Sequence, residues 1–173
     1  FNDIVKSSEY WVKYVKDHES PDIIVGLFHS GWEGGIKTSE YQENEARLVA
    51  EKVPGFDIIF FGHDHTTHNS TVKCADGKEV LCLDPANNAI HVAQADVVFK
   101  KIGSDKYEIV SKAGKLVDVC QYQPDSMLTK HFQADIDSTK SWVNHKIGVF
   151  KHSISTEDCY FGNSAFNDFI MNL

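Results

Sequence analysis

The chain has 173 residues, enough to bury a hydrophobic core in one domain, or in one domain and part of a second. Its composition, 42% hydrophobic and 24% charged, is ordinary for a globular protein, and no apolar run approaches the roughly 20 residues of a membrane helix. The net charge of −8 argues against a surface that binds nucleic acid, because such surfaces need clustered Lys and Arg. A small phosphorylated substrate stays open, since metal ions supply positive charge locally.

The first part of the chain predicts a helix followed by a β-α-β unit. Residues 3–19 carry apolar side chains at helical spacing, and Pro21 ends this helix. Two continuous apolar runs of strand length, 22–28 and 57–61, flank a helix at 46–53. Such runs are typical of parallel strands that are covered on both faces, so we expect a parallel pair with a crossover helix.

The rest of the chain predicts antiparallel hairpins and then helices. Residues 69–83 turn about Asp76-Gly77, and the stretches 89–100 and 106–112 are joined by a second turn. A long helical pattern follows Pro124 to about residue 145, and a short helix begins near Ser164.

The cysteines give little sign of metal binding or disulfides. None of the four belongs to a C-x-x-C pair, which argues against a zinc knuckle. Cys74 and Cys82 flank the first turn, but the register about this turn places Cys74 nearer Glu79. We therefore expect no disulfide between them.

Three of the nine histidines directly follow the predicted parallel strands. His29 ends the first strand, and His63 and His65 follow the second in a Gly-His-Asp-His block. Ligands of open α/β sheets bind beyond the carboxyl ends of the strands, so we expect these imidazoles at one rim. A single strand-end histidine or an isolated His-x-His is weak evidence. The two blocks together, one β-α-β unit apart, predict a site for a transition metal such as Zn, Fe, Mn or Ni.

Other residues near this rim have two interpretations. Asp64 would either orient a ligating imidazole or be a solvated loop carboxylate. The loop 84–88 would either approach a substrate pocket or form an ordinary turn. His68 and His91 would reach the rim only if their strands bring them there, and ordinary histidines are the better interpretation of both. Core packing is predicted for all three tryptophans: Trp11, Trp32 and Trp142.

The Gly-His-Asp-His block and the upstream His29 resemble the last two blocks of the calcineurin-like metallophosphoesterases. Later stretches, Trp142-Val143 and the aromatic run 160–170, look like the bacterial 5′-nucleotidase/2′,3′-cyclic-nucleotide 2′-phosphodiesterase branch of that superfamily. The resemblance implies an α/β fold, an incomplete α+β sandwich of the metallophosphatase type. Its mixed sheet would contain the β-α-β unit followed by antiparallel hairpins. The resemblance also implies that His29 and His63 ligate one metal and His65 the other.

This resemblance further implies a piece of a longer protein. Residues 1–123 would be the back half of the catalytic domain, 124–145 a connecting helix, and 146–173 the truncated start of the C-terminal substrate domain. The family's bridging Asp and catalytic His would lie before Phe1, so we expect no catalytic residue in this chain.

The implied function of the intact protein is metal-dependent hydrolysis of nucleotide phosphate esters, as a 5′-nucleotidase or a 2′,3′-cyclic-nucleotide phosphodiesterase. The cofactors would be two divalent ions (Zn, Mn, Fe or Co), with only part of their site in this chain. The alternative is a non-catalytic fragment or scaffold with a partial His site. The expected partner is a nucleotide or another small phosphate ester, and the implied location is the periplasm or the cell surface. An open sheet edge would favour self-association.

Overall fold

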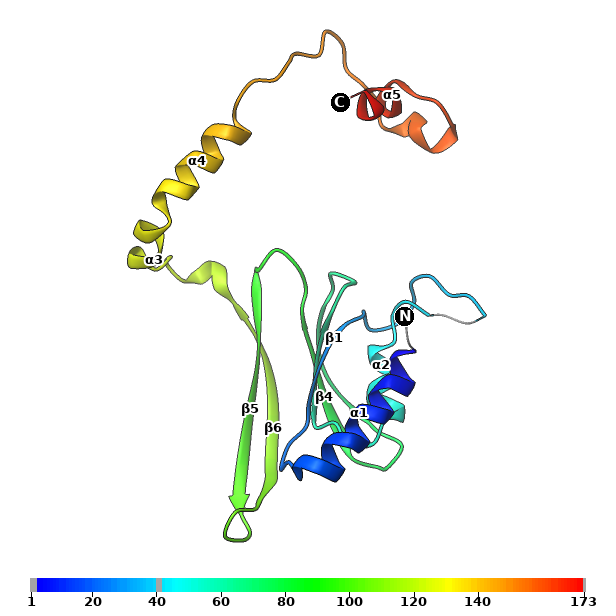
Figure 1. Cartoon of the computed structure of the whole chain (residues 1–173), viewed down its shortest axis with the longest axis vertical. Helices are drawn as coiled ribbons and strands as arrows, with labels where there is room; N and C mark the ends of the chain where they lie inside the picture. Colours follow the sequence, from blue (N-terminus) through cyan, green and yellow to red (C-terminus); the bar gives the residue numbers. More distant parts are fainter. Residues whose placement is uncertain (1–2, 40–41, 173) are drawn as a thin grey trace. The chain divides into compact units, whose positions relative to one another are not determined.

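The computed structural model describes residues 3–39 and 42–172, which divide into two compact units (Figure 1). The division falls between Gln123 and Pro124. The elements of the first unit are, in chain order, α1 (Ile4–Glu19), β1 (Val25–His29), α2 (Ala46–Lys52), β2 (Ile58–Gly62), β3 (Thr67–Lys73), β4 (Glu79–Pro85), β5 (His91–Lys101), β6 (Tyr107–Asp118) and the 3-10 helix η1 (Val119–Gln121).

The central sheet of the first unit has the strand order β1-β2-β4-β3. β1 runs parallel to β2, with His29 opposite Gly62, and β2 runs parallel to β4. β3 is antiparallel to β4 across the turn at Gly77, and β5 and β6 form a separate antiparallel hairpin. The predicted β-α-β unit, both hairpins and the mixed α/β sheet are therefore confirmed.

The central sheet is covered by helices on one face and by the β5-β6 hairpin on the other (Figure 1). Successive residues of a strand point to opposite faces, and β2 follows this alternation. Ile59 and Phe61 pack into the cluster that includes α2, whereas Ile58 packs against Ala93 and Ala95 of β5. This placement explains the continuous apolar sequence of β2.

The hairpin and the sheet approach each other closely at Gly114 of β6. A Cβ atom there would lie 2.5 Å from Leu83 Cδ2 and 2.5 Å from Asn69 Oδ1. The Asn69 side-chain amide donates a hydrogen bond of 2.9 Å to the Gly114 carbonyl. The absence of a side chain at this position thus lets the two sheets pack together.

Burial on both faces was predicted for both parallel strands, and for β1 this prediction is wrong. Leu27 is 85% exposed and Val25 is 49% exposed. β1 is an edge strand of the described sheet, and the β5-β6 hairpin packs on β4 rather than on β1. Only the other face of β1, with Gly26 and Phe28 beside Phe56, is covered.

The core prediction holds for one tryptophan and fails for two. Trp32 packs against the core and stacks on Phe61, with ring centroids 5.3 Å apart. Trp11 is 56% exposed and Trp142 is 80% exposed. In α1 the buried side chains are Ser8 and Val12, which lie on one face of the helix. Trp11 directly precedes Val12 in the sequence, so its side chain points away from this packed face.

The second unit contains short helices in its described residues: α3 (Ser126–His131), α4 (Gln133–Val143), the 3-10 helix η2 (Glu157–Phe161) and α5 (Ala165–Met171). The short helix predicted near Ser164 is confirmed. The single long helix predicted after Pro124 is wrong, because the chain leaves helical geometry at Phe132, with φ −95° and ψ 7°. No side chain of α3 or α4 is buried, so no packing holds the two segments in line.

Two further expectations concern disulfides and membranes. All four cysteines are free, as expected for Cys74 and Cys82. Within the described ranges, none of the helices combines the length and the apolar character that crossing a bilayer would require.

Candidate metal centre

The histidines lie where two parallel strands end side by side. His29 is the last residue of β1 and is paired with Gly62, the last residue of β2. His63 and His65 follow with φ angles of 122° and 60°. Positive φ is uncommon for residues with a side chain, and such strained positions cluster at functional sites. The backbone after β2 thus turns through two unusual conformations to set the directions of these imidazoles.

His29 and His63 face each other. His63 Nδ1 lies 3.2 Å from His29 Nε2, and the ring centroids are 5.0 Å apart with an interplanar angle of 72°. With an ion at the usual Zn–N distance of about 2.0–2.1 Å from both nitrogens, the N–metal–N angle would be about 100°. That angle is close to those of tetrahedral and octahedral coordination. The pair therefore fits two neighbouring ligands of one transition metal ion.

Glu43, in the loop between β1 and α2, binds the other nitrogen of His63. Its Oε1 accepts a hydrogen bond from His63 Nε2 at 2.8 Å, and its Oε2 accepts one from the Ile36 amide at 2.8 Å. The Ile36 amide and then the His63 imidazole hold the pKa of the Glu43 carboxyl below its usual value. Sequence analysis missed Glu43, because nothing in its spacing separates it from any other loop glutamate.

Asp64 joins the two loops that carry the histidines. Its Oδ2 accepts a hydrogen bond from the Trp32 amide at 2.8 Å, and its Oδ1 accepts one from the Thr66 amide at 3.0 Å. Burial raises the pKa of Asp64, but these hydrogen bonds outweigh burial, and the net pKa lies below its usual value. A Cβ atom on Gly31 would lie 2.7 Å from Asp64 Cβ. Asp64 is therefore not a freely solvated carboxylate, and among the described residues it makes no hydrogen bond to an imidazole. Its hydrogen bonds hold the two loops together.

Asp84, near the end of β4, is fully buried. Its Oδ1 accepts a hydrogen bond from the Ala86 amide at 2.7 Å, and among the described residues its Oδ2 has no hydrogen-bonding donor. Burial, together with the nearby Asp64 carboxylate, raises the pKa of Asp84.

The structure does not bring His65 into the same cluster. His65 Nδ1 lies 3.3 Å from the side-chain nitrogen of Asn87, so the loop 84–88 does approach the histidine rim. Across residues 3–39 and 42–172, no three His, Cys, Asp or Glu side chains converge closely enough to hold one ion. Of the three predicted ligands, the structure thus pairs His29 with His63 and leaves His65 beside Asn87.

The other two histidines near the rim have ordinary surroundings. His68 lies against Trp32, with ring centroids 4.1 Å apart, and its Nε2 is 2.7 Å from the Ser70 hydroxyl. Burial lowers the pKa of His68, which favours the neutral ring. His91 begins β5, opposite Asp118 of β6. Packing and strand pairing account for both residues.

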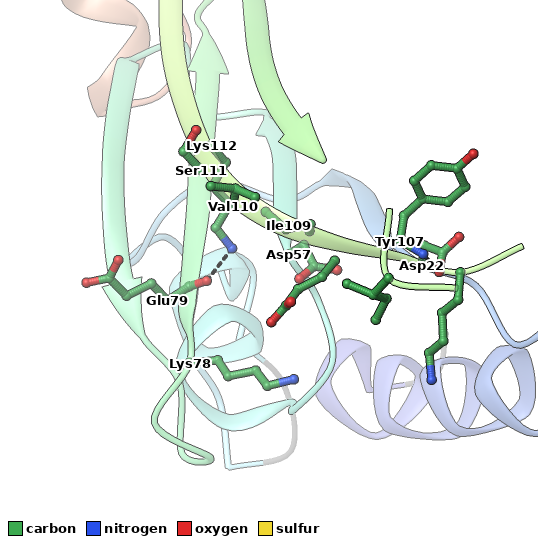
Figure 2. Close-up of a pocket in the computed structure, with 12 residues that line it drawn as sticks. Asp22, Asp57, Lys78, Glu79, Tyr107, Ile109, Val110, Ser111 and Lys112 are labelled. Atoms are coloured by element: carbon green, nitrogen blue, oxygen red, sulfur yellow. Dashed lines mark hydrogen bonds between the residues drawn. The ribbon is translucent and has the colours of Figure 1, made fainter. Parts of the chain in front are cut away.

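A polar cavity elsewhere in the first unit contains none of these histidines. Figure 2 shows the side chains that line it, which come largely from β6 and from residues near the starts of β2 and β4. Its polar groups bind neighbouring backbone: Lys112 donates to the Glu79 carbonyl, and Asp57 accepts from the Ile24 amide. Asp22 likewise accepts from the Tyr107 amide at 3.0 Å. The Lys112 and Asp22 contacts thus tie the hairpin to the sheet, whereas the Asp57 contact joins the residues that precede β1 and β2.

Comparison with known proteins finds similarity to phosphoesterases. No family model matches the sequence. The 2′,3′-cyclic-nucleotide 2′-phosphodiesterase/3′-nucleotidase of Salmonella typhimurium is 28% identical over 166 residues, which cover 85% of this chain and 25% of that protein. The chain thus spans about a quarter of the length of this relative.

Solved structures of phosphoesterases share the fold of this chain. A calcineurin-like phosphoesterase from Bacillus subtilis superimposes with a TM-score of 0.66 at 21% identity. The match covers 83% of this chain and 45% of the Bacillus chain. A 5′-nucleotidase precursor from Thermus thermophilus gives a TM-score of 0.67 at 20% identity, covering 91% of this chain and 31% of its own. The chain therefore has the calcineurin-like phosphoesterase fold, and the resemblance drawn from its histidine blocks is confirmed.

Proposed function

We propose that this chain carries part of the metal centre of a phosphoesterase that hydrolyses phosphate esters of nucleotides. The observation that carries the proposal is the 3.2 Å approach of His29 Nε2 and His63 Nδ1 at the ends of two adjacent parallel strands. Two imidazole nitrogens at this separation are suited to one divalent transition ion. The similarity to a cyclic-nucleotide phosphodiesterase supports the choice of reaction.

The residues of the site have distinct roles in this proposal. Bound divalent ions would activate water and neutralise charge on the phosphoryl group. His29 and His63 present neutral nitrogens to one ion, and His65 presents its ring to a second. Asp64 holds the two loops at a fixed separation through the Trp32 amide. The resulting rigidity keeps the ligand nitrogens in place before an ion arrives.

For the whole protein, we propose the division that the resemblance implies. Residues 1–123 belong to the back half of the catalytic domain, 124–145 connect, and 146–173 begin the substrate domain. The catalytic His and the bridging Asp come from the preceding part, and the protein acts in the periplasm or at the cell surface. The isolated chain would associate with itself through the edge strand β1, where Leu27 is exposed.

Metal titration of the chain tests this proposal. We expect the chain, after dialysis against a chelator, to bind one Zn²⁺ or Co²⁺ ion in isothermal titration calorimetry. His63→Ala and His29→Ala should each lose this binding, because either change removes one of two ligands. His152→Ala, an exposed histidine of the second unit, is the matched control and should bind as the wild type does. Equal binding by all four proteins would refute the proposed centre, as would two ions that survive the chelator.

Activity gives a second test of the same proposal. The chain alone should hydrolyse 2′,3′-cyclic AMP no faster than buffer, since residues that act as a unit fail together when some are absent. Metal-dependent turnover by the chain alone, abolished in His29→Ala, would contradict the division of the centre that we propose.

A further inference from the structure

We propose that Glu43 is a positioning residue, which selects the ring tautomer of His63 and aims its Nδ1 at the ion shared with His29. This inference rests on the proposed metal centre and adds to it a residue that is not itself a ligand. It is carried by the 2.8 Å hydrogen bond between Glu43 Oε1 and His63 Nε2.

The chemistry of the two groups fixes the direction of this bond. A carboxylate only accepts hydrogen bonds, so His63 Nε2 must carry the proton. In the neutral ring Nδ1 then holds the free lone pair, and this atom is the one that lies 3.2 Å from His29 Nε2. A carboxylate or carbonyl on the far nitrogen of a ligating histidine orients the ring and raises its basicity. Glu43 stands in that position.

Glu43 is itself held by the loop on several sides. Its Oε2 accepts the Ile36 amide at 2.8 Å, and the two residues also pair through a backbone hydrogen bond of 3.0 Å. A Cβ atom on Gly35 would lie 2.5 Å from Glu43 Oε2, so the backbone passes directly beside the carboxylate. The Glu43 side chain is only 26% exposed. This arrangement leaves Oε1 as the oxygen that faces His63.

A second link ties the backbone of Glu43 to the strand that carries His29. The Ser30 hydroxyl, buried directly after His29, donates to the Glu43 carbonyl at 2.9 Å and accepts from the Glu45 amide at 2.9 Å. The loop therefore fixes Glu43 relative to His29 through the backbone and relative to His63 through the side chain. One loop thus sets the geometry of both ligands.

The test compares Glu43→Ala and Glu43→Gln with the wild type. Glu33→Ala is the matched control, because Glu33 is an exposed carboxylate of the same loop that pairs with Arg47. The first readout is the His63 tautomer in the metal-free chain, measured at about pH 8 by long-range ¹H–¹⁵N correlation. The second readout is Zn²⁺ affinity by calorimetry.

We expect His63 to be protonated on Nε2 in the wild type and in Glu33→Ala, and to populate both tautomers in Glu43→Ala. Zn²⁺ affinity should fall roughly 10–100-fold in Glu43→Ala, the effect typical of such orienting groups. Glu43→Gln keeps an acceptor oxygen, so it should retain the Nε2–H tautomer and most of the affinity.

Two results would overturn the role of Glu43. One is an unchanged His63 tautomer in Glu43→Ala. The other is a loss of affinity in Glu43→Gln as complete as in His63→Ala, which would make the carboxylate a ligand. The failure of the wild-type chain to bind Zn²⁺ would instead overturn the metal centre, while the tautomer measurement would still decide whether Glu43 orients His63.

Discussion

The two units of the chain bury their apolar side chains to very different extents. In the first unit, β2 and β4 lie between two layers and send alternate side chains into two clusters. In the described part of the second unit only Ser164 is buried, whereas Tyr160 is 85% and Phe161 90% exposed. Apolar residues at helical spacing therefore do not make a core unless another element covers them.

Two helices of the second unit, α3 and α5, have side-chain caps at their first turns. Asp125 caps α3 by accepting from the Leu128 amide at 2.8 Å, and Ser164 caps α5 by accepting from the Asn167 amide at 3.1 Å. Short helices with little packing are marginal in water. The contrast thus lies between a unit stabilised by burial and a unit with little burial, in which α3 and α5 have side-chain caps and α4 has none.

Removing a core leucine should give the largest difference in stability loss between the two units. Leu83 of β4 is fully buried between the sheet and the hairpin. Leu83→Ala should reduce the free energy of unfolding by about 2–5 kcal/mol, through lost transfer energy and a cavity. The matched change in the second unit is Leu128→Ala, at a leucine that is 59% exposed, and it should stay within about 0.5 kcal/mol of the wild type. Urea unfolding followed by circular dichroism measures both, and similar losses would show that the second unit has a core of its own.

Adding a methyl group should destabilise the first unit more than the second, by a smaller difference than the leucine changes. Gly114→Ala places a Cβ atom 2.5 Å from Leu83 and Asn69, so the hairpin must shift, at a cost of about 1–3 kcal/mol. A Cβ atom at Gly148 of the second unit would meet nothing within 4 Å. Gly148→Ala should therefore leave the urea midpoint unchanged. A wild-type midpoint for Gly114→Ala would show that the two sheets are not packed closely at that residue.

Removing a cap should have the smallest effect, and one confined to the second unit. Ser164→Ala should destabilise α5 by about 0.5–2 kcal/mol, because the Asn167 amide loses its acceptor. Hydrogen exchange should accelerate in residues 165–171, while the amides of β2 exchange as in the wild type. Faster exchange in β2 would mean that the two units unfold together.

Sequence reasoning located the elements of the first unit because their burial leaves a pattern. The apolar run of β2 and the turn at Gly77 are local signals, and they place His63 correctly after a strand. The exposure of Leu27 depends on the lateral order of the strands, which no single strand encodes. The break at Phe132 was missed because apolar spacing does not reveal whether two successive helical segments form one continuous helix.

The placement of His29 and His63 at one rim was predictable, but the residues that surround them were not. His29 and His63 could be placed at one rim because parallel strands end together. Glu43 precedes His63 by 20 residues, and the two meet only through the conformation of the loop between β1 and α2. Asp84 lies near Asp64 because β4 pairs in parallel with β2, and the hairpin pattern alone did not reveal this pairing.

At residue 63, the backbone conformation favours glycine, whereas the proposed metal site needs a histidine. A φ of 122° is comfortable for glycine and costs a residue with a side chain of order 1–3 kcal/mol. Glycine at residue 63 would therefore favour folding, yet it would remove the nitrogen that faces His29. The most stable version of this turn and the version that offers an imidazole are different sequences, and the chain carries the second.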